Sequence, residues 1–149
     1  MNTMQNTTKV SHKWLDRSLV ISPVFYTIAS NKEALKDICE HLNVSIDDFQ
    51  SIATDAARTT FFTRKDDNGK TTKITAVVYM ENDPSYSIHS QYGLIVHEAA
   101  HIWQEIKVQL GEDNPSKEFE AYSLQWISQE LMTEFDRQIG RNQANESKE

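Results

Sequence analysis

An HExxH motif at residues 97–101 most restricts what this chain can fold into. In an α-helix, residues four apart project from the same face, so the imidazoles of His97 and His101 can share one metal ion. Zinc suits such a pair, and a catalytic zinc site takes three protein ligands and leaves its fourth position to water. Glu98 follows the first histidine, where its carboxylate can reach that water without binding the metal. We therefore expect zinc ligands at His97 and His101 and a general base at Glu98.

The residues around the motif have the apolar period of a helix. At about 100° per residue, apolar side chains gather on one side of the helix, and His97 and His101 fall roughly opposite. Such a helix would bury its apolar stripe and turn both histidines toward a cleft, whereas histidines of an ordinary core would lie among the apolar positions. The stripe consists of Tyr92, Ile95, Val96, Ala99, Ile102, Trp103, Ile106 and Leu110.

Length and charge limit the classes of protein to consider. A chain of 149 residues is expected to form one domain, which we place at 9–140, between a flexible N-terminal tail at 1–8 and a disordered C-terminal tail at 141–149. The formal charge of -7, without a dense patch of Lys and Arg, argues against a nucleic-acid partner. No apolar run approaches the roughly 20 residues that span a bilayer, and no signal-peptide pattern is present. We expect a cytoplasmic protein without a membrane partner.

The remaining pattern predicts an α+β fold, with a small, mostly antiparallel sheet packed on the motif helix. Three segments rich in β-branched and aromatic residues are expected to be strands, and the loop 66–69 joins the last two into a hairpin. Helical spacing predicts four helices, of which the motif helix is capped by 82–85 and ends at Gly111. The expected strands are 24–28, 59–63 and 74–79, and the other helices are about 32–41, 45–49 and 116–139.

The other potential ligands have ordinary structural interpretations. Cys39 is the only cysteine, which excludes an internal disulfide, and its position in a helix predicts a small core residue. His41 ends the same helix, where a cation complements the helix dipole. We assign His12 to the surface.

The last helix opens with Glu118-Phe119-Glu120, and one of these carboxylates falls in an apolar stripe. A buried carboxylate is costly unless its charge is compensated, and a zinc ion held by two histidines would compensate it. We therefore expect Glu120 to be the third ligand, with Glu118, which points away from the stripe, in reserve. The alternative is that Glu120 only borders the stripe. The other members of this stripe are Leu124, Ile127, Leu131 and Phe135.

HEAAH followed some nineteen residues later by EFEAY resembles the gluzincin arrangement, in which a second helix supplies a glutamate as the third zinc ligand. Metzincins differ, because they need a glycine and a third histidine where this chain has Gln104 and Lys107. The run 97–132, with its HIWQ and EFEAYSLQ segments, resembles small HExxH proteins encoded in phage and prophage genomes, mostly of unassigned function. More distantly, the glutamate-alanine helix is similar to that of repressor-cleaving metallopeptidases of mobile elements.

This resemblance implies a minimal zincin-like domain that hydrolyses a peptide or protein substrate, in the host cytoplasm if the gene is a phage's. His97, His101 and Glu120 would hold the zinc, and Glu98 would be the base that takes a proton from the attacking water. One position departs from the pattern. Thermolysin-like gluzincins carry an aspartate four residues after the ligand glutamate, and this chain has Leu124.

An oxyanion donor and a substrate-binding strand would complete such a site. Tyr122, Tyr86 or His89 could donate to the oxyanion, although for each we prefer an ordinary packing or surface role. By analogy with other folds, the edge strand of the hairpin, near 76–79, could hold an extended substrate by strand addition.

Two alternatives to an enzyme stay open. In a non-catalytic phage accessory or virion component, zinc would fix the two helices together, but a structural site is closed by four protein ligands, and the sequence offers no obvious fourth. In a binding module, the motif would persist without metal. The sequence carries no signal for the substrate's identity or for an oligomeric state.

Overall fold

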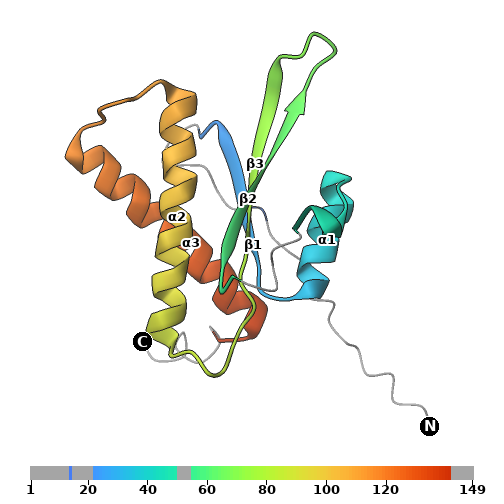
Figure 1. Ribbon diagram of the computed structural model, residues 1–149. Coiled ribbons are helices and arrows are strands. Elements are labelled where there is room, and N and C mark those ends of the chain that lie inside the picture. The colour runs from blue at the N-terminus through green and yellow to red at the C-terminus, as the bar shows by residue number, and fades with distance from the viewer. Residues whose placement is uncertain (1–13, 15–21, 50–54, 142–149) are drawn as a thin grey trace, which may run out of the picture.

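The computed structural model describes residue 14 and the ranges 22–49 and 55–141. The chain is α+β: a three-stranded sheet has α1 on one face and the two long helices α2 and α3 on the other (Figure 1). The tail expected at 1–8, His12 and residues 142–149 lie outside the described residues. The elements are β1 (Val24–Ala29), α1 (Lys32–Leu42), the 3-10 helix η1 (Ile46–Phe49), β2 (Arg58–Lys65), β3 (Thr71–Tyr79), α2 (Ile88–Leu110) and α3 (Lys117–Ile139).

The order of the strands, β1-β3-β2, corrects two expectations. β1 pairs with β3 in parallel, with Val24 beside Ile74, and β2 pairs with β3 antiparallel, with Phe61 beside Ala76. The sheet is therefore mixed and not mostly antiparallel. Because β3 has a strand on each side, the segment 76–79 is central, and the edge strand of the hairpin is β2.

Alternation along the strands divides the buried residues between the two faces of the sheet. Ala76 and Val78 of β3 face α2 and α3, where Leu131 and Phe135 are fully buried. Val77 faces the other way, toward α1. The smaller cluster also contains Cys39, so the expectation of a core cysteine is confirmed, and burial raises the pKa of its thiol.

The buried face of the motif helix is narrower than the sequence predicted. Within the predicted stripe, Val96 is 39% exposed and Leu110 is 37% exposed, while most of the other members are buried. The helix also begins later, because Ser87 and not the segment 82–85 accepts the N-cap hydrogen bond from the Ser90 amide. It ends as predicted at Gly111, whose positive φ of 68° favours glycine.

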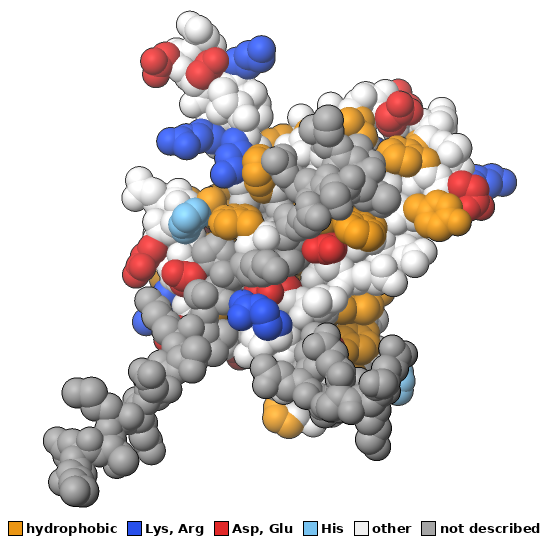
Figure 2. All heavy atoms as spheres, turned by 180° about the vertical axis from the view of Figure 1, so that it is seen from behind, with side chains coloured by type: hydrophobic (Ala, Val, Ile, Leu, Met, Phe, Trp, Pro, Cys, Tyr) orange, Lys and Arg blue, Asp and Glu red, His pale blue; other side chains and the backbone are white. Residues whose placement is uncertain are grey.

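The hairpin extends beyond the helices (Figure 1) and carries acidic and basic side chains at its end (Figure 2). Its turn is organised by Asp66, whose Oδ1 accepts hydrogen bonds from the amides of Asn68 and Lys70. Gly69 follows with a φ of 77°. The predicted β-hairpin is therefore confirmed, and the charges at its end are those of a solvated turn.

A glutamine side chain of α3 binds the backbone at the C-terminal end of β1. Gln138 Oε1 accepts a hydrogen bond from the Ser30 amide at 2.8 Å, and Gln138 Nε2 donates to the Ile28 carbonyl at 2.7 Å. The same Nε2 donates to Glu134, which is also bound by Arg137 through two hydrogen bonds. One side-chain amide thus satisfies two backbone groups at the end of β1, and it connects the sheet to α3.

Replacing Gln138 by leucine should lower the free energy of unfolding by about 2–4 kcal/mol, because it leaves a buried amide and a buried carbonyl at the end of β1 without partners. Urea unfolding followed by circular dichroism measures the change. The matched control is Gln125→Leu on the exposed side of the same helix. Equal stability of the two variants would show that the Gln138 contacts contribute nothing net.

Arg141, which the sequence placed in the tail, closes the C-terminal end of α3. The Arg141 amide donates to the Asp136 carbonyl at 2.8 Å, and its guanidinium lies 3.4 Å from the Asp136 carboxylate.

Among the helices of the described ranges, none has the combination of length and apolar character that crossing a bilayer requires.

Candidate functional site

The two motif histidines lie side by side on the exposed face of α2. Their rings meet edge to face with centroids 4.9 Å apart, and the two Nε2 atoms are separated by 3.2 Å. Two imidazole nitrogens bound to one tetrahedral zinc at about 2.0–2.1 Å would be about 3.3 Å apart. The donor atoms of His97 and His101 therefore already have the spacing that a shared zinc ion requires.

Gln104 orients the second histidine. Its Oε1 lies 3.3 Å from Nδ1 of His101, and with the proton on Nδ1 the ring donates to this carbonyl oxygen and leaves the lone pair of Nε2 available. Zinc-binding histidines commonly have such an outer partner, which fixes the tautomer and the orientation of the ring. We did not predict this role from the sequence, although Gln104, three residues after His101 on a helix, shares its face.

Glu98 is buried between α2 and β2, unlike the histidines on either side of it. The side chain is only 4% exposed, and Thr59 of β2 donates its hydroxyl to Glu98 Oε2 at 2.6 Å. The second oxygen, Oε1, accepts no hydrogen bond from the part of the chain that the structure describes. The carboxylate is thus held at one of its two oxygens.

An open hollow of about 770 Å³ lies between α2 and the beginning of β2, and the motif forms one of its walls. His97, Glu98 and His101 line it from α2, and residues 55–59 with Phe61 line it from the other side. The prediction that the motif helix turns its histidines toward a cleft is confirmed. A substrate in this hollow would touch all three motif residues.

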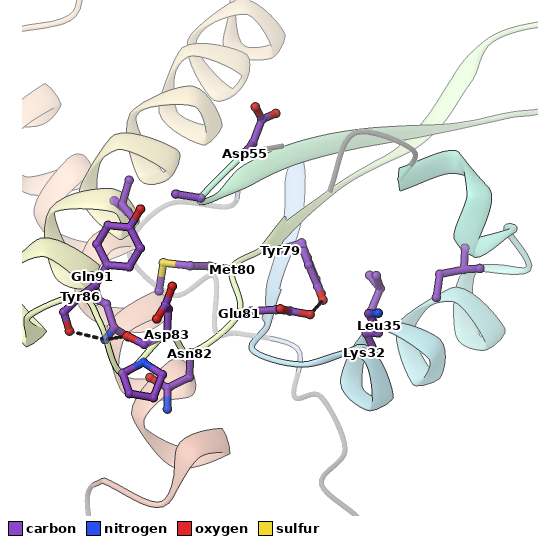
Figure 3. Close-up of a pocket in the computed structure, with 14 residues that line it drawn as sticks. Lys32, Leu35, Asp55, Tyr79, Met80, Glu81, Asn82, Asp83, Tyr86 and Gln91 are labelled. Atoms are coloured by element: carbon purple, nitrogen blue, oxygen red, sulfur yellow. Dashed lines mark hydrogen bonds between the residues drawn. The ribbon is translucent and has the colours of Figure 1, made fainter. Parts of the chain in front are cut away.

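A second cavity of about 740 Å³ adjoins the hollow and shares Asp55, Ala56 and Leu94 with it. Figure 3 shows it between α1, which contributes Lys32, and the segment that leads from β3 into α2. Tyr79 donates its hydroxyl to Glu81 at 2.5 Å, and burial is the main reason why the pKa of Tyr79 is raised. The two cavities therefore share part of one wall.

Glu120, the predicted third ligand, is not brought to the histidines. Its Oε1 accepts hydrogen bonds from the indole of Trp103 at 3.0 Å and from the ammonium of Lys107 at 3.2 Å. These two bonds, that from Trp103 first, hold the pKa of Glu120 below its ordinary value. The side chain is 43% exposed, so the expected deep burial is not found, and Lys107 compensates its charge.

The described residues contain no group of three or more His, Cys, Asp or Glu side chains placed to hold a metal ion. The structure therefore assembles the pair His97 and His101 with Glu98 beside it, and it leaves Glu120 on the flank of α2. The reserve candidate, Glu118, is exposed on the first turn of α3.

The candidate oxyanion donors also lie apart from the histidines. Tyr122 is 60% exposed on α3, and Tyr86, 46% exposed, lines the second cavity. His89 is exposed in the first turn of α2. None of these three side chains lines the hollow in front of the motif.

Comparisons with known proteins identified no match to this chain. The chain matches no protein-family model, no curated protein and no solved structure.

Proposed function

We propose that this protein is a zinc-dependent hydrolase of peptide bonds, of the gluzincin type that its motifs resemble. The observation that carries the proposal is the 3.2 Å separation of the two Nε2 atoms, which fits one zinc ion. Glu98 supports it further, because a carboxylate beside the two ligands in an open hollow has the place of a general base.

The roles of the residues follow from their positions. His97 and His101 would hold the zinc ion, which supplies an activated water with a pKa near 7 and polarises the carbonyl of the substrate. Glu98 takes a proton from the attacking water at Oε1, the oxygen that Thr59 leaves available. As the new carbon–oxygen bond forms and the carbon–nitrogen bond breaks, Glu98 can return that proton to the leaving amine.

The position of β2 at the edge of the sheet supports a peptide as the substrate. Arg58, Thr59 and Phe61 of this strand line the hollow, and among the described strands only β3 pairs with β2. An extended peptide can add to such an edge through main-chain hydrogen bonds and pass in front of the histidines. The substrate strand that we expected at 76–79 is thus replaced in this proposal by β2.

Glu120 remains our proposed third ligand, supported by its resemblance to the gluzincin glutamate and by its place on α3, which packs along α2. Binding zinc would require its carboxylate to exchange its bonds with Trp103 and Lys107 for the metal. The side chain is half-exposed, so it has room to rotate.

Replacing Glu120 by glutamine should therefore weaken zinc binding by at least about tenfold, since a neutral amide is a poor ligand. Zinc affinity measured by competition with a chelator tests this. Lys107→Met is the control, because it removes the salt bridge and keeps the carboxylate. If both variants bind zinc as the parent does, Glu120 serves only to join α3 to α2.

Metal analysis and a cleavage assay together test the proposed function. The protein is purified without added zinc, analysed for metal, and incubated with a library of internally quenched peptides, with and without a chelator. We expect bound zinc and cleavage that the chelator abolishes. Zinc without cleavage would favour a non-catalytic zinc-binding protein, and a protein that takes up no zinc would favour a binding module.

A further inference from the structure

Among the described residues, one side chain from another element holds the carboxylate of Glu98, and its donor is the hydroxyl of Thr59. We propose that Thr59 is a positioning residue of the hydrolytic site, which aims Glu98 at the attacking water. This inference rests on the proposed function. It assigns a role to an edge-strand residue that lies 39 positions before the base in the sequence.

The geometry separates the two oxygens of the carboxylate. Thr59 Oγ1 lies 2.6 Å from Oε2, a short distance that is typical of a hydroxyl donating to an ionised acceptor. Glu98 lines the hollow together with the histidines, and Oε1 is the oxygen to which no described residue donates. A carboxylate that is fixed at one oxygen has fewer rotamers and presents the other oxygen in one direction.

Thr59 lies on a strand that can hold the side chain of Glu98 in place. It lies in β2 opposite Val78 of the central strand, and Val78 is fully buried. Threonine is β-branched, so its χ1 is restricted. A donor on a rigid strand holds an acceptor more closely than a donor on a loop would.

A purely structural role for Thr59 makes a different prediction. In that case the hydroxyl only satisfies a buried acceptor, and its loss lowers stability without changing the reaction selectively. A positioning role changes kcat while the binding of zinc and the KM for the peptide remain the same. Serine, which keeps the hydroxyl, should restore most of the lost turnover.

The experiment compares Thr59→Val, Thr59→Ser and Thr63→Val in the zinc-loaded full chain, with one quenched peptide that the parent cleaves. Thr63→Val is the matched control, because Thr63 is exposed on the same strand and pairs with Ile74 away from Glu98. For Thr59→Val we expect kcat to fall by about 10- to 100-fold, with KM and zinc content unchanged. Thr59→Ser and Thr63→Val should remain within about threefold of the parent.

A binding measurement gives a second readout that does not depend on turnover. Acetohydroxamic acid releases a proton when it chelates zinc, so an aligned Glu98 that accepts this proton strengthens its binding. By calorimetry, we expect Thr59→Val to bind acetohydroxamic acid about tenfold more weakly than the parent or Thr59→Ser does.

The outcomes separate the two proposals. If the parent neither binds zinc nor cleaves the library, the proposed function fails, and the role of Thr59 fails with it. If the parent is active and Thr59→Val matches it in kcat and in hydroxamate affinity, the positioning role alone is overturned. The same holds if Thr59→Ser is as impaired as Thr59→Val.

Discussion

Replacing Glu98 by glutamine should leave the zinc content unchanged and lower peptide hydrolysis by about 10²–10⁴-fold, the usual contribution of a general base. The physical reason is that the amide keeps the shape of the side chain but does not take up a proton at neutral pH. Its carbonyl oxygen can still accept the hydrogen bond from Thr59, so the packing between α2 and β2 is preserved.

The comparison requires zinc analysis and turnover of the variant and the parent side by side. The control is Glu105→Gln, the same change two turns further along α2. Among the described residues, the carboxylate of Glu105 accepts a side-chain hydrogen bond only from Gln109. A Glu98→Gln protein that loses its zinc would show that Glu98 is a ligand. One that cleaves as fast as the parent would show that the motif does not work as a hydrolase motif, and the non-catalytic alternative would then be preferred.

The double replacement of His97 and His101 by alanine should abolish zinc binding and reduce hydrolysis to the background rate. Both side chains are exposed, so their removal takes away the metal ligands without opening a cavity in the core. The metal-free variant should therefore unfold at the same temperature as the metal-free parent, and added zinc should raise the unfolding temperature of the parent only.

Thermal unfolding with and without zinc, together with metal analysis, checks this result. His89→Ala is the control, because His89 is another exposed histidine of the same helix, two turns before His97. Full zinc occupancy in the double variant would mean that the metal binds elsewhere. The assignment of the site, and the hydrolase proposal with it, would then be withdrawn.

Patterns within short stretches of the sequence predicted the local parts of this protein. Apolar periods of 3.6 and 2 residues, together with turn and cap chemistry, predicted three features. These are the two helices that carry His97 and Glu120, the hairpin around Gly69, and the position of the histidines facing a cleft. These features depend on neighbours within a few residues along the chain. The pairing of His97 with His101 was predictable for the same reason, since their spacing of four residues is set by the helix itself.

The contacts between residues far apart in the sequence depend on how the helices and strands pack. The parallel pairing of β1 with β3 places β2 at the edge, and this brings Thr59 to Glu98. The packing of α3 along α2 brings Glu120 within hydrogen-bond distance of Trp103 and Lys107, two partners that the helix wheel did not identify. A wheel shows which face of its own helix a residue occupies, but the partner of that face depends on how helices and strands pack across long separations in sequence. That packing is determined by the burial of the whole core, which no local pattern contains.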